Sequence, residues 1–239
     1  LVFGGASYVS PLVLSYLITR QTASGADSAV VGFFDAWIPT TMPWSRFYVL
    51  CLLLALLMIG VVALLKIPRL SLQEDEKVEG FETVVKLLKD KTVRIFFFGI
   101  FCYVGFEQGV SVWIATFLEN YHQTDGAATT GLFWGMQAVG GLLGLLLMKL
   151  FDVKKVLGMF VLLAFVSLLT ALYSSVEWAL WAFPAVGFFT SVMYPSVFSL
   201  GLNSLSSHHG TFAGILCTGI IGGAIFPFLI GALGDATQL

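Results

Sequence analysis

Seven long apolar runs constrain the fold of this chain most strongly. They cover approximately residues 1–19, 45–66, 95–118, 127–149, 156–173, 178–202 and 211–234. Most reach the ~20 residues that an α-helix needs to cross about 30 Å of hydrocarbon. Charged residues make up only 11% of the chain, whereas a soluble domain carries about a quarter. Because only helices and closed barrels satisfy their backbone in lipid, the pattern predicts an all-α membrane protein with about seven transmembrane helices.

The basic residues fix the expected orientation. Segment 66–94 holds seven Lys and Arg residues and segment 149–155 holds three, so ten of the 12 lie on one side of the membrane. By the positive-inside rule, that side is cytoplasmic. We therefore expect a multi-pass protein of the plasma (inner) membrane whose first helix begins inside. The net charge of −2 gives no reason to expect a nucleic-acid partner.

The polar segment 67–94 is a candidate linker on the inner side. Its apolar residues follow a helical spacing at Val78, Phe81, Val84, Val85 and Leu88. Two interpretations remain open. The segment forms an amphipathic helix on the inner membrane face, or it is a solvated tether. In either form, a charged linker suits a joint between two helical bundles.

Glu107 lies in the middle of the run 95–118. At ~1.5 Å per residue it is about 18 Å from the start of that helix, too far for its side chain to reach water at the membrane surface. Such a carboxylate costs several kcal/mol unless it is protonated, hydrated or paired. No Lys or Arg lies at similar depth in any predicted helix. The sequence therefore predicts a solute or proton path beside Glu107, with a tie between helices as the alternative.

Polar neighbours of Glu107 extend this candidate site. Tyr103 and Ser111 share its helix face at four-residue steps, and Gln108 is one position further round. An aromatic ring, a carboxylate and a hydroxyl in a line suit a sugar. The ring would pack on the sugar's C–H face, and the carboxylate would accept hydrogen bonds from its hydroxyls.

Later helices add weaker candidates. Trp134 and Gln137 place a ring beside an amide, although Trp134 also fits a packing or lipid-facing role and Gln137 a bond between helices. Asn203 is a further polar candidate near the inner end of the run 178–202. Pro195 removes a helical hydrogen bond. Its kink would serve either packing or a cavity that uses the freed carbonyls.

Residues of enzymatic or metal chemistry form no recognisable pattern. The three cysteines lie within apolar runs and lack disulfide or metal-ligand spacing. His208 and His209 are adjacent on an inner loop and form no ligand set. We expect no metal, no cofactor and no enzymatic activity.

Three stretches resemble a known family. In this order, CYVGFEQG, VMYPSVFSLGLNSL and GIIGGAIFPFLIGALGD resemble the fucose/glucose/galactose permeases of the major facilitator superfamily, and the resemblance covers roughly 95–235. It implies proton-coupled uptake of a hexose or deoxyhexose by alternating access, in a monomer. It also implies solute contacts at Tyr103, Glu107 and Gln108. One departure is Asp152, which is followed by Val153 where the superfamily loop has an arginine.

The resemblance also predicts the domain organisation. Family members have twelve helices in two bundles of six, so we expect a fragment that begins at the fifth helix. Residues 1–66 would be the last two helices of the N-terminal bundle. Residues 67–94 would be the cytoplasmic linker, and 95–239 the C-terminal bundle without its last helix.

Three other functions remain open. A carrier of a non-sugar solute, such as an organic anion, would call for a buried Arg or Lys that these helices lack. A seven-helix receptor fits the number of helices but not the orientation, since its N-terminus would lie outside. A membrane enzyme would need polar residues gathered near one face, and only His208 and His209 offer a start.

Overall fold

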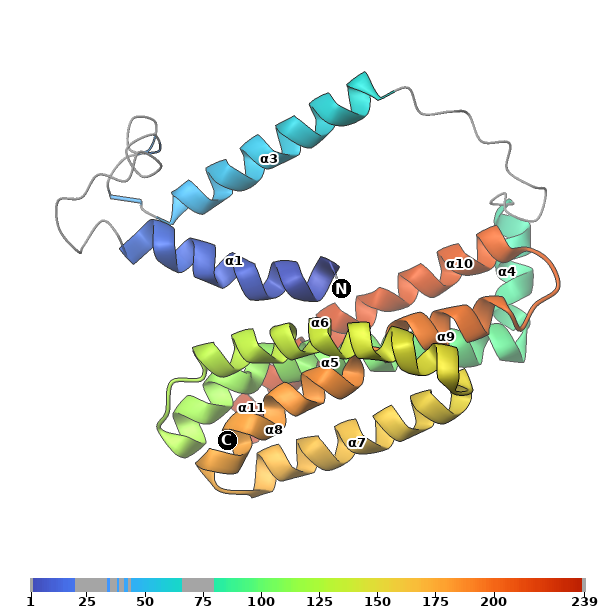
Figure 1. The fold of residues 1–239 in the computed structure, drawn as a ribbon. Helices are drawn as coiled ribbons and strands as arrows, with labels where there is room; N and C mark the ends of the chain where they lie inside the picture. The colour runs from blue at the N-terminus through green and yellow to red at the C-terminus, as the bar shows by residue number, and fades with distance from the viewer. Residues whose placement is uncertain are drawn as a thin grey trace. The chain divides into compact units, whose positions relative to one another are not determined.

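The computed structural model describes residues 2–19, 34, 38, 41, 42, 44–65 and 80–237. These residues form helices and contain no strand. In chain order the helices are α1 (Val2–Thr19), α3 (Ser45–Leu64), α4 (Phe81–Lys89), α5 (Lys91–His122), α6 (Ala127–Leu150), α7 (Val153–Tyr173), α8 (Val176–Thr190), α9 (Met193–Leu202), α10 (His209–Thr218), the 3-10 turn η2 (Gly219–Ile221) and α11 (Gly222–Thr237) (Figure 1). The chain divides into two compact units, Ala6–Ser71 and Leu72–Leu239 with Leu1–Gly5.

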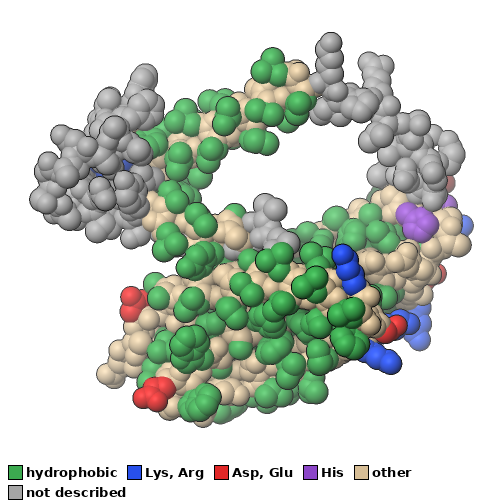
Figure 2. Space-filling view, in the orientation of Figure 1, with side chains coloured by type: hydrophobic (Ala, Val, Ile, Leu, Met, Phe, Trp, Pro, Cys, Tyr) green, Lys and Arg blue, Asp and Glu red, His purple; other side chains and the backbone are tan. Residues whose placement is uncertain are grey.

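Six helical stretches in the described part of the chain are long and apolar enough to cross a membrane. They are Ser45–Leu64, Lys91–His122, Ala127–Leu150, Val153–Tyr173, Val176–Leu202 and His209–Thr237. The remaining predicted span corresponds to α1, with 18 residues. The prediction of an all-α membrane bundle is confirmed. Hydrophobic side chains cover most of the visible face of the bundle, and Lys and Arg gather at one of its ends (Figure 2).

Helix α3 in the smaller unit is exposed along most of its length. All its residues from Cys51 onward are exposed, and Leu57 and Ile59 are both more than half exposed. In the described part of this unit, Phe34 and Ile38 form a small buried cluster with Val13 and Phe47, and the Arg46 side chain is fully buried.

Capping residues define where the bundle helices begin. Asp90 accepts a hydrogen bond from the Thr92 amide at 2.7 Å, so α5 begins immediately after α4. Asp152 accepts from the Lys154 amide at 2.9 Å and closes the short turn between α6 and α7. These aspartates satisfy amides that a helix N-terminus leaves without partners. The short turn between α6 and α7 lets these consecutive helices run antiparallel.

Glycine allows α6 and α8 to approach closely. A methyl group at Gly140 would overlap the backbone oxygen of Phe188, and one at Gly187 would overlap that of Phe133. Small residues at such contacts let two helix backbones pack directly in a membrane. Around this contact, a buried core brings together α5, α6, α7 and α8 through Ile114, Leu118, Phe133, Ala171, Ala179, Ala182, Phe183 and Val186.

The linker segment contains a helix of nine residues, α4. Leu87 is its buried residue and packs with Val93 of α5 and Phe212 of α10. Among the apolar positions expected from the sequence, Phe81 is 80% exposed, whereas Val84 is half-buried. Val78 lies outside the described residues.

Two of the spans are interrupted. Helix α8 ends at Thr190 and α9 begins at Met193. Pro195, in the first turn of α9, has no N–H to donate to the Ser191 carbonyl, as a continuous helix would require. The span His209–Thr237 is interrupted by the 3-10 turn η2 between α10 and α11. Pro227 of α11 lies four residues beyond Gly223 and cannot donate to its carbonyl.

Candidate functional site

A cavity of about 520 Å³ lies where α5 and α6 face these two interruptions. Its lining combines polar and apolar groups from four segments of the chain. The lining residues are Tyr103, Val104, Glu107, Gln108, Gln137, Ala138, Gly141, Ser191, Tyr194, Pro195 and Ile220. A cavity of this size is typical of sites for small solutes.

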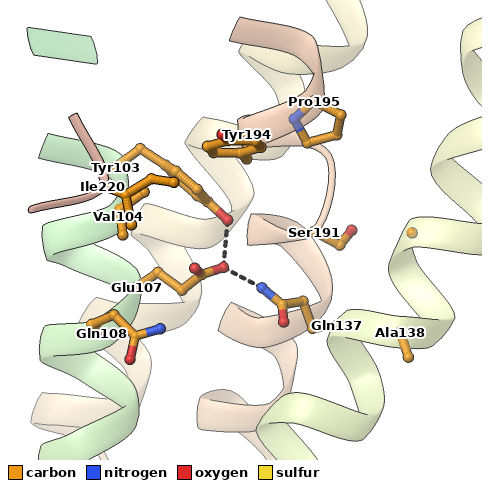
Figure 3. Close-up of a pocket in the computed structure, with 11 residues that line it drawn as sticks. Tyr103, Val104, Glu107, Gln108, Gln137, Ala138, Ser191, Tyr194, Pro195 and Ile220 are labelled. Atoms are coloured by element: carbon orange, nitrogen blue, oxygen red, sulfur yellow. Dashed lines mark hydrogen bonds between the residues drawn. The ribbon is translucent and has the colours of Figure 1, made fainter. Parts of the chain in front are cut away.

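Glu107 is the centre of the polar contacts in this cavity. Its side chain is buried, with 7% exposed, on the face of α5 turned toward α6. The Tyr103 hydroxyl and the Gln137 Nε2 both donate to the same atom, Glu107 Oε1 (Figure 3). No described protein group donates to the second oxygen, Oε2. Two side chains thus hold the carboxyl group by one oxygen and leave the other for a solute or water.

Tyr103 makes a second contact that the sequence pattern did not indicate. Its hydroxyl lies 3.2 Å from the backbone oxygen of Thr190, the last residue of α8. Carbonyls in the last turn of a helix lack helical partners, so the tyrosine acts as a cap at this end. Its ring also lies beside that of Tyr194, with centroids 6.4 Å apart and the planes tilted by 45°.

Both helix interruptions reach the cavity. Ser191, Tyr194 and Pro195 come from the junction of α8 and α9, and Ile220 comes from η2. Non-helical backbone at membrane depth is tolerated where protein or a polar cavity surrounds it. The Ser191 hydroxyl donates to the Phe188 carbonyl at 2.7 Å, so it satisfies part of the broken helix itself.

The structure brings four of the sequence-predicted residues into this cavity: Tyr103, Glu107, Gln108 and Gln137. Sequence analysis missed Thr190 and Ser191. Their position shortly before Pro195 could have predicted them, because short hydroxyl side chains often satisfy carbonyls that a proline leaves free.

The other three predicted residues lie elsewhere. Ser111 is buried on α5 and donates to the Gln108 carbonyl at 3.2 Å. Trp134 packs against the core of α5 to α8, edge-on to Phe133. Asn203 is exposed at the end of α9, where its amide lies 3.4 Å from the Ser199 hydroxyl. None of the three lines the cavity.

The chemistry of the lining favours a neutral, hydroxyl-rich solute. It offers a carboxylate oxygen, two amide side chains and two tyrosines, and no basic residue. A carboxylate accepts hydrogen bonds from hydroxyls, and amides both donate and accept. In the described part of the chain no three His, Cys, Asp or Glu residues lie close enough to hold a metal ion.

Sequence comparison identifies relatives of this chain. The sequence profile of the Major Facilitator Superfamily matches residues 6–227. A protein of Brucella abortus named "Glucose/galactose transporter" is 34% identical over 208 residues, which cover 84% of this chain and 50% of the relative. A "Putative glucose/galactose transporter" of Helicobacter pylori is 31% identical over 231 residues, which cover 95% of this chain and 54% of the relative. The chain thus spans about half the length of these curated relatives.

Comparison of structures gives the same fold. A crystal structure of the E. coli fucose:proton symporter FucP matches with a TM-score of 0.69 and 20% sequence identity, covering 98% of this chain and 61% of that one. A second crystal structure of FucP, in the outward conformation, matches with a TM-score of 0.66. The helical arrangement is therefore that of part of a major-facilitator bundle.

Proposed function

Because this chain belongs to the Major Facilitator Superfamily, we propose that it is part of a secondary transporter for a hexose or deoxyhexose. Uptake is coupled to a proton and proceeds by alternating access. The observation that carries the proposal is a carboxylate oxygen of Glu107 to which no described group donates, in a cavity whose described lining contains no basic residue. The names of the glucose/galactose relatives support the class of substrate.

In this proposal the sugar binds with a hydroxyl donating to Glu107 Oε2. Gln108 of α5 supplies a second amide on the same side of the cavity. The apolar parts of Val104 and Ile220 contact the C–H surface of the ring. This arrangement combines a few directed polar groups with apolar walls, as sites for small solutes commonly do.

The proposed domain organisation follows the family. Residues 1–66 are the last two helices of the N-terminal bundle, 67–94 are the cytoplasmic linker, and 95–239 belong to the C-terminal bundle. A solute path in such a transporter lies between two bundles. The cavity beside Glu107 is then the contribution of the C-terminal bundle to a larger site.

Replacing Glu107 tests this function. We expect Glu107→Gln, in cells that express the transporter, to lower the accumulation of radiolabelled glucose, galactose or fucose by roughly tenfold or more, since a hydrogen bond to a charged group is lost. The matched control is Glu119→Gln, an exposed carboxylate on the same helix, which should leave accumulation unchanged. Equal accumulation by Glu107→Gln and the parent protein across the pH range would exclude Glu107 from the mechanism.

A competition experiment separates sugars from other solutes. Unlabelled hexoses should block the uptake of labelled sugar, and organic anions should not, because no lining residue is basic. Uptake of an organic anion with no competition from hexoses would favour the carrier of a non-sugar solute instead.

A further inference from the structure

The Tyr103 hydroxyl lies between two acceptors on different helices. One is Glu107 Oε1, on its own helix α5. The other is the Thr190 backbone oxygen at 3.2 Å, at the end of α8 where the span is interrupted. A tyrosine hydroxyl has one proton to donate and lone pairs with which to accept. It therefore makes one strong donated bond at a time, to Glu107 or to Thr190.

The protonation state of Glu107 decides between these bonds. An ionised carboxylate is the stronger acceptor, so it takes the tyrosine proton and leaves the Thr190 carbonyl with the weaker contact. When a hydronium ion in the cavity gives its proton to the open oxygen Oε2, Oε1 becomes the carbonyl oxygen of a neutral carboxyl group and a weaker acceptor. The Tyr103 proton then turns to Thr190. One proton enters from water, and no covalent bond other than its O–H bond is formed.

We propose that Tyr103 is a positioning residue that links the protonation of Glu107 to the junction of α8 and α9. Protonation of the carboxyl group strengthens the cap on the last turn of α8, and ionisation weakens it. The junction responds because Pro195 leaves it without a continuous helical hydrogen-bond ladder. This inference rests on the proposed function only in assigning a changing protonation state to Glu107.

The surroundings leave few other groups that could carry the effect. Among the residues that line the cavity, the titratable groups besides Glu107 are Tyr103 and Tyr194. Cys217 of α10 lies beside Tyr194. From α6 and α8, the groups that face Glu107 are the Gln137 amide and the Thr190 carbonyl, neither of which titrates. We therefore assign the change of protonation to Glu107, which carries the one carboxyl group among the residues that line the cavity.

Hydrogen–deuterium exchange of the 239-residue chain in lipid nanodiscs tests the link. Exchange of a peptide covering 188–198 is measured at an acidic and at a neutral pH and corrected for the intrinsic rates. A peptide from the middle of α7 serves as the reference. We expect the corrected amide exchange of the junction to be about fivefold slower at acidic pH than at neutral pH. One hydrogen bond produces a change of this size.

Three variants make the test specific. Glu107→Gln stays neutral, so its junction should exchange slowly at both pH values. Tyr103→Phe cannot form either bond, so its junction should exchange rapidly at both. Tyr121→Phe, an exposed tyrosine on the same helix, should keep the pH dependence of the parent chain. Unchanged exchange in α7 verifies that each variant is folded.

Two results would overturn the inference. One is a parent chain whose junction exchanges equally at both pH values. The other is a Tyr103→Phe variant that keeps the full pH dependence. Neither depends on transport, so this experiment fails or succeeds independently of the uptake assay that tests the proposed function.

Discussion

Two neighbouring membrane spans, α7 and the pair α8–α9, satisfy their backbone hydrogen bonds in different ways. Helix α7 runs without interruption and contains no proline, and Leu162 and Phe165 on its outer side are more than half exposed. The span of α8 and α9 is interrupted, carries Pro184 and Pro195, and lines the polar cavity. Apolar sequence is sufficient for a helix against lipid. An interrupted helix survives at membrane depth only where neighbouring groups satisfy its backbone.

The largest expected difference between the two spans concerns glycine. Gly187 of α8 packs against the Phe133 backbone, whereas Gly158 of α7 has open space around it. We expect Gly187→Ala to lower the free energy of unfolding by about 2–3 kcal/mol, because the methyl group forces α6 and α8 apart. Gly158→Ala should be neutral or stabilising by up to about 1 kcal/mol, since alanine favours the helix.

Unfolding of the purified chain in detergent, followed by circular dichroism, measures both changes. Equal stability of the two variants would contradict the close contact between α6 and α8, and with it the geometry that positions the Ser191 end of the cavity.

A second experiment asks whether proline maintains the interruption. Pro195→Ala restores an N–H that can donate to the Ser191 carbonyl, so α8 and α9 should approach a continuous helix. We expect hydrogen exchange between residues 191 and 196 to slow by roughly fivefold, the effect of one added hydrogen bond. In this respect the span would become similar to α7.

Pro184→Ala is the matched control, because Pro184 lies within α8 where the helix is continuous. It should leave exchange between residues 191 and 196 unchanged. An equal effect of both substitutions on that segment would show that Pro195 has no local role.

The smallest expected difference concerns two threonines with similar local bonds. Thr190 is fully buried and donates to the Gly187 carbonyl at 2.9 Å near the end of α8. Thr170 donates to the Val166 carbonyl at 3.0 Å within α7, where the helix already supplies an amide partner. Thr190→Val should therefore destabilise the chain by about 1 kcal/mol.

Thr170→Val should change stability by less than about 0.5 kcal/mol. Chemical denaturation of the two variants side by side gives the comparison. A loss at Thr170 as large as that at Thr190 would show that the interruption of α8 gives its carbonyls no special need for a partner.

The sequence predicted more of the helices than of the cavity. The long apolar runs identified the spans, because crossing a bilayer requires a continuous stretch of apolar side chains. They did not show that the span His209–Thr237 is interrupted at η2. Ser111 illustrates a further limit, since it shares a helix face with Glu107 yet lies outside the cavity and bonds to its own helix.

By itself, the sequence determined that this chain is helical and lies in a membrane, and that Glu107 requires polar partners there. Local composition and spacing are enough for those conclusions, because lipid penalises every unsatisfied charge and backbone group. Only the tertiary structure decided which groups are those partners. Gln137 is 30 positions from Glu107 in the chain and Thr190 is 87 positions from Tyr103, and the packing of α5, α6 and α8 is what brings them together.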